Sequence, residues 1–72
     1  MGFTRATQTY TEGEKVLVRG RFLAEPAVVV DGSGDSVVVA IAPESNRTED
    51  ITGFRLWEHR NVEPRTLRRY EW

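Results

Sequence analysis

The sequence predicts an all-β fold, a small antiparallel barrel, from three observations. Its 72 residues have room for one domain with one thin core. Apolar and polar side chains alternate with a period of two over residues 16–23, as they do in a half-buried strand. Two valine-rich runs, residues 27–30 and 36–42, flank the sequence DGSGD, whose glycines supply the backbone freedom that a hairpin loop needs.

The first strand of this barrel is expected to begin after Glu14. Its alternation places Val16, Val18 and Phe22 toward the core. Arg19 and Arg21 then point outward. We therefore expect one buried face and one face that carries two arginines.

Prolines bound the two valine-rich strands. Pro26 precedes the second strand and Pro43 follows the third, because proline cannot donate to a ladder of hydrogen bonds. Residues 44–50 contain no apolar side chain and are predicted as a surface loop. Residues 31–35 form the hairpin loop between these strands.

Residues 51–57 predict a fourth strand, with a bulge at Gly53. Phe54 and Leu56 would lie on its inner face. Arg55 and Trp57 would lie on its outer face.

The chain after this strand is too polar for another long strand. Residues 59–64 suit a single 3-10 turn with Val62 tucked inward. Residues 65–72 predict either a last strand or a short helix on which Leu67 and Tyr70 share a face, and the helix is slightly favoured.

Two short motifs resemble the Tudor-like branch of the SH3-like (Src-homology-3-like) barrels. Residues 13–16 (GEKV) are similar to the opening of that family, and residues 56–64 (LWEHRNVEP) are similar to its ending. The resemblance covers residues 13–64 and implies a barrel there, with residues 1–12 as a flexible tail and residues 65–72 as an extension packing on it. Recognition of methylated side chains does not follow, because the second and third strands offer no aromatic residue for a cage.

Charge and residue usage narrow the function classes. The formal net charge is -1, from 10 Lys and Arg against 11 Asp and Glu, so no global field draws the chain to nucleic acid or anionic lipid. Lys15 is the only lysine beside nine arginines, a bias that is usual in GC-rich coding sequences. We interpret it as pointing to an actinobacterium or one of its phages.

Catalytic and metal-binding arrangements are not recognisable. The chain has one histidine, His59, and no cysteine, so a nucleophile with its base cannot be assembled from the usual residues. Asp31 and Asp35 lack the glycine and glutamate that a calcium loop needs at its sixth and twelfth positions. We expect no enzymatic activity, no cofactor and no metal.

One outer surface is the first candidate for function. Arg19 and Arg21 on the first strand would combine with Arg55 and Trp57 on the fourth. Such a surface can hold a peptide through cation–π and apolar contacts, or stack bases. The alternative is structural: Trp57 covers one end of the barrel, and the arginines form a solvated face paired with Glu58 and Glu12.

The C-terminal aromatics are the second candidate. Tyr70 and Trp72 either pack back on the barrel or anchor another protein. We include both among the expected partner-binding residues.

These features predict a non-catalytic adaptor or regulatory module that binds a host or viral protein and is encoded by a phage. A nucleic-acid-binding barrel and a structural subunit of a virion or oligomer are the alternatives. The sequence shows neither an export signal nor an apolar run that could span a membrane, so we expect a cytoplasmic location without membrane contact. Nucleic acid is expected to bind weakly, and a homo-oligomer is compatible with the pattern.

Overall fold

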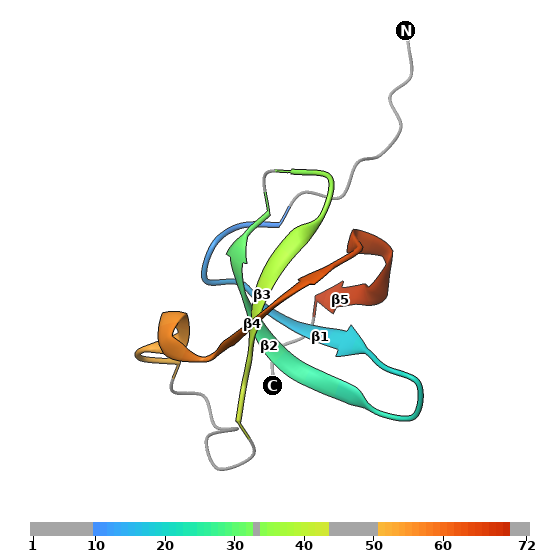
Figure 1. Ribbon diagram of the computed structural model, residues 1–72, viewed down its shortest axis with the longest axis horizontal. Coiled ribbons are helices and arrows are strands. Elements are labelled where there is room, and N and C mark those ends of the chain that lie inside the picture. The colour runs from blue at the N-terminus through green and yellow to red at the C-terminus, as the bar shows by residue number, and fades with distance from the viewer. Residues whose placement is uncertain (1–9, 33, 44–50, 70–72) are drawn as a thin grey trace, which may run out of the picture.

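The computed structural model describes residues 10–32, 34–43 and 51–69, which form one five-stranded antiparallel sheet (Figure 1). The prediction of an all-β fold is confirmed, since these ranges contain no α-helix. Within the same ranges, no helix is long and apolar enough to cross a membrane. The elements are β1 (Lys15–Arg19), β2 (Ala24–Asp31), β3 (Val37–Ile41), the 3-10 turn η2 (Phe54–Leu56), β4 (Glu58–Val62), the 3-10 turn η3 (Pro64–Thr66) and β5 (Leu67–Arg69).

The strand order is β4-β3-β2-β1-β5. The first four strands form a meander, and β5 returns to pair with β1. Among the described residues β4 and β5 remain the two edges, so the sheet is open between them. Figure 1 shows η2 and the β1–β2 turn at opposite ends of this sheet.

The first strand is shorter than predicted, because the chain reverses after Arg19. Residues 20–23 form a turn in which the backbone N–H of Gly20 donates to the carbonyl of Leu23 at 2.9 Å. The prediction that Phe22 belongs to the core is therefore wrong, and its side chain is 88% exposed. A period of two identifies a face only as long as the chain stays extended.

The valine hairpin matches the prediction closely, and β2 continues on both sides of the predicted run. Pro26 lies inside β2, opposite Leu17 of β1. Its carbonyl accepts the N–H of Ala42 at 2.9 Å, so its missing N–H would also point to that side of the strand. The proline therefore removes only one hydrogen bond between β2 and the chain just after β3. The hydrogen bonds between β2 and β1 are not affected.

The prediction of a fourth strand over residues 51–57 is wrong. Gly53 has a φ of 78°, a left-handed conformation that glycine adopts without strain, and it starts the turn η2 instead of a bulge. Phe54 is buried as expected, but Leu56 is 91% exposed. A 3-10 turn has three residues per turn, so residues two apart do not share a face as they do in a strand.

The next two predicted elements also differ from the structure. Residues 58–62 form the edge strand β4, and the second 3-10 turn begins only at Pro64. Val62 is half-buried against the core. The slight preference for a C-terminal helix is wrong, because Leu67–Arg69 forms β5 on β1, while residues 70–72 lie outside the described part of the chain.

Two apolar clusters lie on opposite faces of the sheet. The larger one also buries Tyr10, which the sequence analysis had placed in the N-terminal tail. The smaller one forms where η2 covers Val28 and Ala40, with Val30, Ile51 and Trp57 at its margin. The larger cluster contains Tyr10, Val16, Val18, Ala27, Val29, Val37, Val39, Ile41 and Leu67.

Candidate functional site

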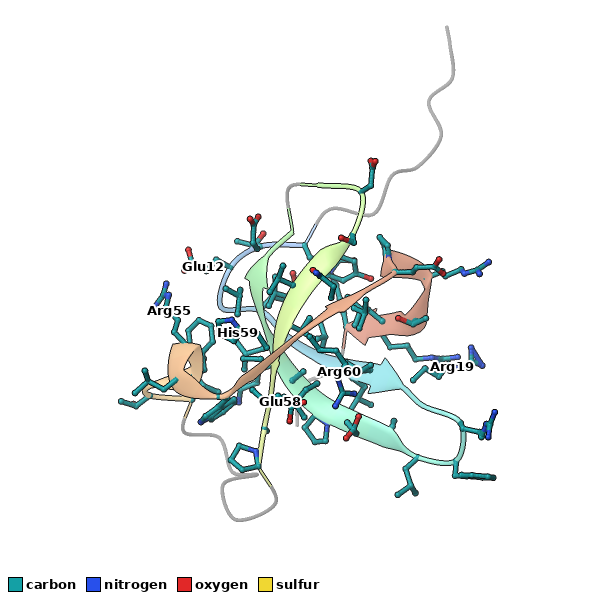
Figure 2. All side chains as sticks on the ribbon, viewed as in Figure 1. Glu12, Arg19, Arg55, Glu58, His59 and Arg60 are labelled. Atoms are coloured by element: carbon teal, nitrogen blue, oxygen red, sulfur yellow. The ribbon has the colours of Figure 1, made fainter. Side chains whose placement is uncertain are left out.

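The structure does not bring the four arginine and tryptophan positions of the first candidate surface together. Arg19 ends β1, and Arg21 follows in the turn. Arg55 and Trp57 belong to η2 and the residue after it. Figure 2 shows Arg19 and Arg55 at opposite ends of the molecule, so these residues cannot form one continuous surface.

The η2 end agrees with the structural alternative. Arg55 forms an ion pair with Glu12, and its guanidinium carbon lies 4.8 Å from the centre of the Phe54 ring. Trp57 is half-buried and packs against the smaller cluster. Arg55 and Trp57 are therefore engaged within the chain, whereas Leu56 of the same turn is exposed.

His59 is engaged in the same region, beside η2 (Figure 2). Its Nε2 lies 2.9 Å from the carbonyl oxygen of Arg55, an atom that only accepts, so Nε2 carries the proton and donates it. The ring is exposed. Within the described ranges, no group of three or more His, Cys, Asp or Glu side chains is placed to hold a metal ion.

The β1–β2 turn is the most unusual surface feature. Phe22 is 88% exposed and Leu23 is 77% exposed, and they are adjacent in the chain. A 72-residue domain has few large apolar side chains to build its core from, so two of them left in solvent at one turn are unexpected on stability grounds. Exposed apolar surface that is rimmed by polar residues makes this turn a candidate contact site.

The two strands approach each other closely at this turn. A Cβ atom at Gly20 would lie 2.6 Å from the carbonyl oxygen of Leu23, so only glycine allows the two strands to approach so closely. Arg19 and Ala24 form the last pair of the β1–β2 ladder directly below. The two apolar side chains therefore follow directly on the paired end of the β1–β2 ladder.

Arginines divide into two groups by their partners. Arg55, Arg60, Arg65 and Arg69 each form an ion pair with a carboxylate. Arg19, Arg21 and Arg68 form none within the described part of the chain. All three of these unpaired arginines belong to β1, its turn or its neighbour β5.

Arg60 illustrates the paired group. Its Nη1 donates to Oε1 of Glu25 at 2.8 Å, and Glu58 lies at 3.6 Å from its Nη2. The hydrogen bond to Glu25 is the main cause that raises the pKa of Arg60 above its ordinary value, against a smaller lowering by burial. The Arg60 side chain therefore connects β4 with β2.

Sequence reasoning found Arg19 and Arg21 but missed the apolar pair beside them and missed Arg68. The available signal was Gly20, a residue that breaks the alternating run between two arginines and favours a turn. Tyr70 and Trp72, the other two predicted binding residues, lie outside the described part of the chain. Comparison with protein-family models, with curated proteins and with solved structures found no match to this chain.

Proposed function

We propose that the protein is a non-catalytic interaction module of the SH3-like class that binds another protein through its β1–β2 turn. The single observation that carries the proposal is the pair Phe22 and Leu23, two consecutive exposed residues of a turn that a backbone hydrogen bond closes. The side chains at this turn are arginine, phenylalanine and leucine, which suit binding and supply no acid, base or nucleophile at neutral pH.

The SH3-like assignment rests on the order of elements. A four-stranded meander, a 3-10 turn and a short last strand that returns to β1 support this assignment, and the described sheet is open between β4 and β5. The motif at residues 13–16 leads into β1, in keeping with the resemblance noted in the sequence.

The turn is suited to act as an anchor. Aromatic and arginine side chains are enriched at protein interfaces, and the few that enter a pocket carry most of the binding energy. Fully burying a phenylalanine or leucine side chain contributes about 1.5 to 3 kcal/mol each. The hydrogen bond of Gly20 restrains the turn, which lowers the backbone entropy that binding costs.

A comparison of matched variants tests this function. The variant Phe22→Ala/Leu23→Ala removes the anchor, and Leu56→Ala removes an equally exposed apolar side chain at the other end of the molecule. A protein captured from the native host, then purified, should bind the anchor variant roughly ten- to hundredfold more weakly and bind Leu56→Ala as tightly as the wild type. Equal affinity of all three proteins, or a loss confined to Leu56→Ala, would reject the turn as the binding element.

A further inference from the structure

We infer that the sheet face beside the turn recognises an acidic segment of the partner polypeptide, through Arg19, Arg68 and Arg21. This inference rests on the proposed function and specifies the chemistry of the partner. Its basis is the placement of the arginines that form no ion pair among the described residues.

Pairing across the sheet gathers these side chains. Arg68 of β5 lies directly opposite Leu17 of β1, which in turn lies opposite Pro26 of β2. Residues opposite each other in antiparallel strands share a face, and Arg19, two residues beyond Leu17, shares it too. Arg68 and Arg19 are thus diagonal neighbours above the half-buried pair Leu17 and Pro26.

The described strand residues on this face offer no carboxylate that could pair with Arg19 or Arg68. Glu25 of β2 lies opposite Val18, on the other face, where it binds Arg60. Glu14 is engaged by Arg69, whose guanidinium carbon lies 4.4 Å from the centre of the Tyr10 ring. Among the described residues, the face around Leu17 therefore carries arginines without a paired carboxylate, although the chain as a whole has a net charge of -1.

The turn that follows Arg19 adds an exposed apolar tip at this end of the sheet. Arg21 is exposed in the turn, two residues after Arg19 and directly before Phe22. A partner that fits must offer carboxylates to the arginines and an apolar pocket to the tip. Guanidinium groups bind carboxylates through paired hydrogen bonds, which matches an acidic polypeptide.

Nucleic acid fits this face less well. Phe22 at the tip is the single aromatic ring of the proposed site, and the strand positions beside Leu17 add none on which further bases could stack. Tight non-specific binding to a polyanion normally needs more phosphate contacts than three arginines supply. The floor formed by Leu17 and Pro26 is aliphatic and suits the side chains of a peptide.

The test compares two labelled peptides by fluorescence anisotropy on the full 72-residue chain. In the first peptide glutamate alternates with leucine and phenylalanine, and in the second glutamine replaces every glutamate. A short oligothymidylate is the third probe. We expect the glutamate peptide to bind at least about tenfold more tightly than the glutamine peptide, with an affinity that falls as salt is added.

Two double variants with the same charge change locate the site. Arg19→Gln/Arg68→Gln should weaken binding of the glutamate peptide about tenfold, whereas Arg55→Gln/Arg65→Gln should leave it within about twofold. Circular dichroism confirms that both variants are folded. Equal losses in the two variants, equal affinities for the two peptides, no binding of the glutamate peptide, or tighter binding of oligothymidylate would overturn the inference.

Failure of this inference can be told apart from failure of the proposed function. If Phe22→Ala/Leu23→Ala weakens binding of the purified partner but the arginine variants do not, the anchor stands and acid recognition is wrong. If only Arg19→Gln/Arg68→Gln weakens binding, the acidic segment is recognised and the anchor is wrong.

Discussion

Arg60 of β4 donates a 2.8 Å hydrogen bond to Glu25 at the start of β2, although β3 separates these two strands in the sheet. The two side chains are 40% and 34% exposed. A contact between strands that are not neighbours requires the sheet to curl, and this one joins its two halves on the face of the larger cluster. Because solvent reaches the pair, its contribution to stability is about 1 kcal/mol or less.

Glu25→Gln should lower the free energy of unfolding by up to about 1 kcal/mol, because the charge-assisted bond across the sheet is lost. Glu63→Gln is the control, since Glu63 pairs with Arg65 only two residues away and holds no separate strands together. Urea denaturation of both variants measures the difference. A larger loss in Glu63→Gln would mean that the bridge across the sheet has no special role.

The same bridge should not respond to pH near neutrality. Glu25 raises the pKa of Arg60, so the stability that Arg60 contributes is fully present below its unfolded-state pKa. It is lost only as the pH rises through the higher folded-state pKa, which lies in the strongly alkaline range. The difference in unfolding free energy between the wild type and Arg60→Gln should therefore stay constant from about pH 6 to pH 9 in urea titrations. A difference that shrinks toward pH 9 would contradict this assignment.

Gly20→Ala should destabilise the domain by about 1 to 3 kcal/mol, because its Cβ would lie 2.6 Å from the carbonyl oxygen of Leu23. Gly34→Ala is the matched control in the other hairpin, where the nearest atom to a new Cβ lies 3.8 Å away. Thermal unfolding of the two variants should separate them clearly. If both melt alike, the β1–β2 turn is not as tightly closed as described.

Val39→Asp should unfold the domain, because Val39 is fully buried in the larger cluster. Burying an unpaired charge there costs more than the free energy of unfolding of a small domain. Val38→Asp places the same charge on the opposite, half-buried side of β3 and should leave a folded protein. Circular dichroism and proton NMR report the outcome. Two folded variants would show that the assignment of faces on β3 is wrong.

Mixed-sequence DNA or RNA should bind no more tightly than ~10⁻⁵ M at physiological salt, because few arginines are available for phosphate contacts. Fluorescence anisotropy with labelled single and double strands at two salt concentrations measures this. Sub-micromolar affinity with a steep salt dependence would favour the nucleic-acid-binding alternative over a protein partner.

The valine hairpin was predictable because it is buried, and burial leaves a pattern of apolar residues in the chain. β4 left no such pattern: it is an edge strand with Arg60 and Val62 half-buried and its other side chains exposed, so only its pairing with β3 defines it. The turn η2 was misread as a strand because Phe54 and Leu56 are two residues apart and both apolar.

The candidate site was predictable in part for a related reason. Arg19 and Arg21 stood out as polar residues in an apolar run, but the same run made Phe22 look like a core residue. The end of β1 is set by the close approach of Gly20 to Leu23. The alternation of apolar and polar residues does not indicate such a contact. The alignment of Arg68 with Leu17 depends on β5 returning to β1, a contact between distant parts of the sequence.

That return of β5 sets an order of events during synthesis. Val16 and Val18 pair with Arg69 and Leu67, which leave the ribosome last among the described residues. Of the described strands β1 is made first, and it can pair with β2 at once but obtains its second neighbour only when residues 67–69 are available. Contacts between such distant segments slow folding, so the pairing of β5 with β1 should be a late step in folding of the domain.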